Sequence, residues 1–95
     1  MTRGNLTPKV QKLALSYLNR KISQTELRLY PYLNYCLKNF NEIDLRLISK
    51  EEKDILSQLE AEENLSIQGN KLFVTKQFYD YLQKVLAETY VETFY

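Results

Sequence analysis

The sequence predicts a mainly α-helical domain that carries one small antiparallel β-hairpin. Three observations predict this class. Ser49 is followed three residues later by Glu52, a capping-box pattern that opens a helix. Gly69-Asn70 is a two-residue loop between two short apolar runs, as in a tight hairpin. A long amphipathic pattern then follows Thr75, whose hydroxyl can cap a last helix.

Length and composition favour one ordered domain over residues 1–95, with loose ends at 1–6 and 92–95. Of the 95 residues 44% are hydrophobic and only two are glycine and two proline, a composition typical of a helical globule. The net charge is +1, but it is unevenly distributed. Residues 1–49 carry eight basic and three acidic side chains, a balance of +5, and residues 50–95 carry five and nine, a balance of −4. This asymmetry indicates a basic face and an acidic face.

Thr7-Pro8 predicts the start of the first helix, because proline at the first helical position loses no hydrogen bond. The apolar face of this helix is formed by Val10, Leu13, Ala14, Tyr17 and Leu18.

Ser23 and Glu26 form a second capping-box pattern, which opens the segment SQTELRLYPYLNYCLKNF. Pro31 interrupts its helical pattern at a cost of about 3 kcal/mol. The sequence therefore predicts either a kink or two helices that meet near Tyr30. Tyr30, Tyr32 and Tyr35 cannot all face one core, so at least one is expected to be partly exposed.

Residues 42–48 allow two predictions. As a helix, the segment would be the first helix of a helix-turn-helix, with Ser49 in the turn. As a strand, alternation of Ile43, Leu45 and Leu47 would add a third strand to the hairpin.

The capped helix after Ser49 has a narrow apolar stripe and is expected to stop at Asn64 in a left-handed conformation. The stripe consists of Ile55, Leu56 and Leu59. In the hairpin, a Gly69-Asn70 loop pairs Gln68 with Lys71, so that four aliphatic side chains share one face and Phe73 lies on the other. These four are Leu65, Ile67, Leu72 and Val74. The last helix buries a face of Phe78, Leu82, Val85, Leu86 and Thr89.

The composition argues against an enzyme and against a cofactor or metal site. Histidine, the commonest general base and metal ligand, is absent. Cys36 is the only cysteine and is interpreted as a small buried hydrophobe. The acids Glu60, Glu62 and Glu63 are best interpreted as a solvated helix end, and neither glycine belongs to a phosphate-binding loop. No segment has the length of a secretory signal or a membrane span, so a soluble cytoplasmic protein without a membrane partner is expected.

The stretch KDILSQLEAEENLSIQGNKLFVTKQFYDYL, residues 53–82, resembles the second half of a winged helix-turn-helix domain, and the likeness extends over residues 41–90. This resemblance implies a winged-helix-like domain of three to five helices that binds double-stranded DNA as a regulatory or accessory protein. It would place Lys50–Glu63 in the major groove and the wing Gln68–Lys71 on the backbone or in the minor groove.

The charges depart from that pattern. The implied reading helix carries six acids against Lys50 and Lys53, and phosphates repel acids. The basic residues of the first half, with Arg3 among them, are therefore expected to do most of the binding. The candidate DNA-binding residues are Lys9, Lys12, Arg20, Lys21, Arg28, Lys50, Lys53 and Lys71.

The alternative is a protein-interaction module without DNA affinity. It would bind either a second copy of itself, as a homodimer, or another protein. Its motivation is the eight tyrosines together with an aromatic tail, because aromatic residues are enriched in interface cores. The candidate interface residues are Phe73, Tyr79, Tyr90, Val91, Phe94 and Tyr95.

Overall fold

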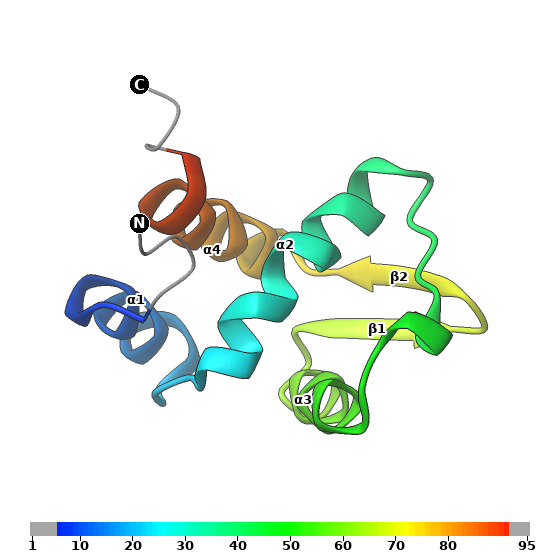
Figure 1. Cartoon of the computed structure of the whole chain (residues 1–95), viewed down its shortest axis with the longest axis horizontal. Helices are drawn as coiled ribbons and strands as arrows, with labels where there is room; N and C mark the ends of the chain where they lie inside the picture. The colour runs from blue at the N-terminus through cyan, green and yellow to red at the C-terminus, as the bar shows by residue number, and fades with distance from the viewer. Residues whose placement is uncertain (1–5, 92–95) are drawn as a thin grey trace.

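The computed structural model describes residues 6–91 and the side chains of residues 6–89. The chain is mainly helical with a two-stranded antiparallel hairpin, as predicted (Figure 1). The elements in order are α1 Pro8–Leu18, α2 Gln24–Lys38, the 3₁₀ turn η1 Leu45–Leu47, α3 Lys50–Ala61, β1 Leu65–Gln68, β2 Lys71–Val74, α4 Lys76–Leu86 and the π-helical turn η2 Ala87–Val91.

The predicted helix starts are confirmed by their capping bonds. The Thr7 hydroxyl accepts from the backbone N–H of Val10, and Pro8 takes the first turn of α1. At α3 the capping box is complete, because the Ser49 hydroxyl accepts from the Glu52 N–H while the Glu52 carboxylate accepts from the Ser49 N–H. At α4 the Thr75 hydroxyl accepts from the backbone N–H of Phe78. These bonds satisfy N–H groups that a helix leaves without partners.

The α2 helix differs from its prediction in two respects. It runs without a break through Pro31, so the two-helix alternative is wrong. Leu29, Tyr30 and Leu33 around the proline are all buried, and their burial stabilises the continuous helix against the local cost. Ser23 caps the helix as expected, but the Glu26 carboxylate bonds to side chains in the core instead of closing the box.

The hairpin has the predicted register. Leu65 pairs with Val74, Ile67 with Leu72 and Gln68 with Lys71. Gly69 has a φ of 65°, a left-handed value that favours glycine. Leu65 and Leu72 are buried, and Ile67 and Val74 pack against the same core, while Phe73 on the opposite face is 47% exposed.

Residues 42–48 form neither of the predicted elements. Glu42 makes a single bridge to Lys71, so the strand alternative holds at one residue pair only. The chain then leaves the sheet in one 3₁₀ turn, in which the Leu47 N–H donates to the Asp44 carbonyl and the Asp44 carboxylate accepts from the Arg46 N–H. Ile48 is extended before Ser49 starts the next helix, so the full first helix of a helix-turn-helix is wrong.

The helix stop at Asn64 is also wrong by one residue. Glu63, with a φ of 63°, has the left-handed conformation. Asn64 is 9% exposed, and its side-chain oxygen accepts from the Tyr17 hydroxyl 3.0 Å away. A tertiary hydrogen bond therefore uses the asparagine that local propensity assigns to the helix end.

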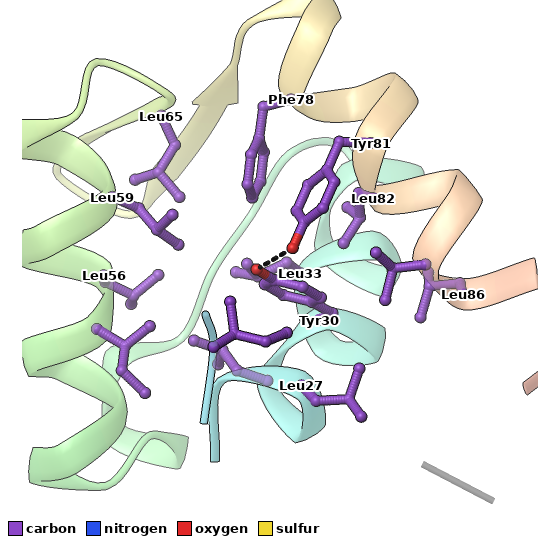
Figure 2. Packing of buried hydrophobic residues seen from close by; sticks show 14 of the residues in the cluster. Leu27, Tyr30, Leu33, Leu56, Leu59, Leu65, Phe78, Tyr81, Leu82 and Leu86 are labelled. Atoms are coloured by element: carbon purple, nitrogen blue, oxygen red, sulfur yellow. Dashed lines mark hydrogen bonds between the residues drawn. The ribbon is translucent and has the colours of Figure 1, made fainter. Parts of the chain in front are cut away.

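The core lies where α2, α3, α4 and the hairpin meet (Figure 2). Leu56 and Leu59 of α3 face Phe78 and Leu82 of α4, and side chains of α2 fill the space between them. Cys36 is fully buried there, as expected for a small hydrophobe. Of the three α2 tyrosines, Tyr35 is 62% exposed, which confirms that not all of them face the core.

We expect Gly69→Ala to lower the free energy of unfolding by about 1 kcal/mol, because alanine is strained at a positive φ. No atom lies within 4 Å of the position that a Cβ would occupy, so the loss would come from the backbone alone. Gly69→Asn should lose less, since asparagine tolerates this conformation. Urea denaturation measures both, and an unchanged midpoint for the alanine variant would contradict the turn.

Candidate functional site

Three of the predicted DNA-binding residues lie together on α1 and the segment that follows it. Lys9, Lys12 and Lys21 line one shallow hollow with apolar neighbours that include Leu6 and Leu15. All three lysines are exposed. The Lys9 ammonium lies 3.3 Å from the Glu88 carboxylate, a solvent-exposed pair that contributes little stability.

Arg20 is not part of this basic group. Its guanidinium donates to the Glu62 carboxylate, with Nε–Oε2 at 2.7 Å, and to the Glu26 carboxylate, with Nη1–Oε1 at 3.0 Å. Each acid receives two such bonds, because Nη2 also reaches both carboxylates. These bonds, first of all the one to Glu62, raise the pKa of Arg20. The guanidinium thus ties the α1–α2 connection to the end of α3.

Tyrosine hydroxyls extend this network into the core. Tyr30 donates to Glu26 at 2.8 Å, so Tyr81, 3.1 Å away, must donate to the Tyr30 oxygen (Figure 2). Burial raises the pKa of Tyr30 and raises the pKa of Tyr81 to about 12. The Glu26 side chain is 3% exposed, so a substrate does not reach it. We name Arg20, Glu26, Glu62, Tyr30 and Tyr81 the polar cluster, and its closed geometry indicates a structural role.

The other predicted DNA contacts are scattered. Arg28 is exposed on α2, and Lys50 and Lys53 are exposed on α3 among acids. Lys71 in the hairpin donates to the Phe40 carbonyl at 3.2 Å and lies 3.5 Å from Glu42. Figure 1 shows α1 on one side of α2 and α3 on the other, so the α1 lysines and the α3 lysines do not form one surface.

A different surface gathers exposed apolar side chains. Among the described residues, six large hydrophobic side chains are exposed, and four of them lie between positions 35 and 47. We name these four, Tyr35, Phe40, Leu45 and Leu47, the 35–47 surface. Figure 1 shows this part of the chain leaving α2, passing the turn of the hairpin and entering α3.

A groove of about 520 Å³ runs along this surface. We name it the Tyr35 groove. Its apolar wall is formed by Tyr32, Tyr35, Leu45 and Leu47, and the amides of Asn39 and Asn70 also line it. The Tyr32 and Tyr35 rings are stacked, with centroids 6.3 Å apart and planes 19° apart. Its charged lining residues are Glu42, Asp44 and Arg46.

The predicted interface residues are only partly described. Phe73 is exposed on the outer hairpin face, and Tyr79 is half-buried on α4. Tyr90 and Val91 belong to η2, but their side chains lie outside the described residues, as do Phe94, Tyr95 and Arg3.

Apart from the predicted exposure of one α2 tyrosine, sequence patterns indicated neither the 35–47 surface nor the polar cluster. The apolar residues after α2 alternate as strand residues do, so their exposure was not expected. Arg20 and Glu62 are 42 residues apart, and no local pattern joins them. Within residues 6–91, no group of three potential metal ligands is close enough to hold an ion. No helix of this part of the chain has the length and apolar character needed to cross a membrane.

We expect Arg20→Ala to lower the free energy of unfolding by about 3 kcal/mol, because Glu26 would stay buried without its cation. Thermal or urea denaturation measures this loss. Arg46→Ala is the matched control, since the Arg46 side chain is 90% exposed beside Asp44 and its removal should leave stability unchanged. Equal effects of the two substitutions would contradict the structural role of Arg20.

Comparison with known proteins adds no assignment to this geometry. No family model matches the chain, and neither a curated protein nor a solved structure matches it significantly.

Proposed function

We propose that this chain is a protein-interaction domain that binds its partner through the 35–47 surface. The observation that carries this proposal is the concentration of exposed apolar side chains in the last turn of α2 and in the segment that joins α2 to α3. Leu47 is 71% exposed and Phe40 is 86% exposed, although both sit beside a well-packed core. Tyr35, Leu45 and Leu47 line one groove, and an exposed apolar patch is typical of an interaction site.

The backbone at Phe40 supports the proposal independently. Phe40 and Asn41 have φ values of 62° and 60°, a conformation that bulky residues rarely adopt. Phenylalanine here costs conformational energy, and its ring gains no burial in return. Glycine or asparagine would suit the folded chain better. We infer that the aromatic ring serves contact with another molecule.

Hydrogen bonds hold this conformation in place. The Leu72 N–H donates to the Asn41 carbonyl at 2.7 Å, and the Asn41 side-chain amide donates to the Leu72 carbonyl at 2.9 Å. The Ile43 N–H donates to the Asn70 carbonyl at 2.9 Å. The hairpin therefore fixes the segment that presents the apolar side chains, and a rigid surface loses little entropy when it binds.

We expect Phe40→Gly to raise the free energy of unfolding by about 1 kcal/mol while it weakens binding, because glycine relieves the left-handed strain and removes the exposed ring. Binding is measured with a displayed library of random peptides selected on the wild-type protein. The selected peptides should bind Phe40→Gly and Leu47→Ser at least about tenfold more weakly.

Leu15→Ser is the matched control, since Leu15 is 45% exposed on α1, outside the 35–47 surface. It should leave peptide binding unchanged. Selected peptides that bind all three variants equally, or a library that yields no binders, would refute the proposal.

DNA binding is the second candidate, and the hollow lined by Lys9, Lys12 and Lys21 favours it. Among the described residues no acid lines that hollow, although Lys9 pairs with Glu88 beside it, so Lys12 and Lys21 can approach phosphates. The winged-helix reading of α3 remains a hypothesis, and the acidic surface of α3 opposes it. Arg20 is bonded to two carboxylates and is left out of this candidate.

If DNA is bound, a mobility shift on generic duplex should weaken by more than about tenfold between low and moderate salt. The Lys9→Ala/Lys12→Ala/Lys21→Ala variant should lose the shift and keep its fold, because the three side chains are exposed. Lys50→Ala/Lys53→Ala is the control on α3. Loss of the shift in this control alone would favour the winged-helix mode, and no shift in the wild type would remove DNA binding.

A further inference from the structure

We propose that the occupant of the Tyr35 groove is a proline-rich peptide segment with a basic residue at its flank. This inference rests on the proposed function and names the chemistry of the partner. It follows from three properties of the groove, which are its stacked aromatic wall, its free hydrogen-bonding groups and its charge.

The aromatic wall suits pyrrolidine rings. Tyr32 and Tyr35 are one helical turn apart on α2 and present two nearly parallel rings to the groove. Leu47 continues the apolar surface beyond them. Proline-rich segments dock in aromatic-lined grooves of this kind, since their polyproline II conformation exists before binding and costs little entropy to order.

The polar groups suit an extended backbone. A polyproline II segment has no internal hydrogen bonds, so its carbonyl oxygens need donors. Within the described part of the chain, the Tyr35 hydroxyl and the Asn70 side-chain amide make no hydrogen bond, so both can donate to such carbonyls. The Tyr32 hydroxyl oxygen accepts from the Asp44 N–H at 3.0 Å, which ties this ring to the segment after α2. A helical ligand, whose carbonyls are bonded within the helix, would leave the two donors unused.

One exposed carboxylate of the groove can accept a basic flank. The charged lining residues are Glu42, Asp44 and Arg46, and with the Lys71 ammonium beside Glu42 two acids and two bases balance. Arg46 is bonded to Asp44 through Nε and Nη2, both at 3.0 Å, so these two charges neutralise each other. Glu42 is 58% exposed and lies 3.5 Å from Lys71, a long and solvated contact. Glu42 is therefore the carboxylate available to an arginine or lysine of the peptide.

The test titrates three peptides into the isotope-labelled full chain and follows amide shifts by NMR. These are an oligoproline that ends in arginine, the same peptide ending in glutamate and a Gly-Ser peptide ending in arginine. We expect the first to shift residues of the Tyr35 groove, the second to bind about threefold to tenfold more weakly at low salt, and the third to bind not at all.

Two variants sharpen the test. Tyr35→Ala should weaken binding of the first peptide at least about tenfold, and Glu42→Gln should abolish the preference for arginine over glutamate. Phe73→Ala is the control, since Phe73 is an exposed aromatic on the other hairpin face and lies outside the groove. Shifts elsewhere, equal binding of the Gly-Ser peptide, or an effect of Phe73→Ala equal to that of Tyr35→Ala would overturn the inference.

Failure of this inference is distinguishable from failure of the proposed function. Library-selected peptides without proline that still depend on Leu47 would leave the interaction surface standing and refute the proline-rich occupant. Self-association in sedimentation that is lost in Tyr35→Ala would identify a second copy as the occupant and would also refute it. Absence of binding by both the oligoproline and the library would refute both.

Discussion

The reversal of the chain at Gly69-Asn70 positions both the core and the candidate binding surface. Because the loop has two residues, the hairpin register places Leu65 and Leu72 on the helices. The opposite edge of β2 then holds the segment after α2, through the bond from the Leu72 N–H to the Asn41 carbonyl. A different register would bury polar side chains and would also release the 35–47 surface. Stability and surface therefore depend on the same turn.

The polar cluster explains why the positive charge of the first half does not form one basic face. Arg20 links the α1–α2 connection to α2 and to the end of α3, because its guanidinium donates to the carboxylates of Glu26 and Glu62. A buried carboxylate without a cation is costly, so the charge serves the fold before it serves a partner. Of the other basic side chains described in the first half, only Lys9, Lys12 and Lys21 line one hollow together, and Arg28 lies apart on α2. The apolar surface at the other end of the molecule is the more unusual feature.

Much of the fold could be predicted because its signals are local. The Ser49 box depends on groups three residues apart, and the hairpin depends on a loop length and an alternation that can be counted in the sequence. The errors share a different cause. Asn64 faces Tyr17 and the Glu26 carboxylate turns toward Arg20, in both cases because of a tertiary contact. For Pro31 the sequence left a kinked helix and two helices open, and burial around the proline decided for one helix. The candidate site was missed because exposure of Leu47 depends on where η1 ends.

The sequence alone determined where the capped helices begin and which two segments pair as the hairpin, since caps, turn residues and apolar periodicity act over a few residues. It also determined which aliphatic side chains of the hairpin face the core. Only the tertiary structure decided which polar side chains are hydrogen-bonded within the fold, as Arg20 is. It also decided which apolar side chains stay exposed to solvent, as Phe40 does. Burial is a property of the assembled elements, because each side chain is covered or exposed by neighbours that the local sequence does not contain.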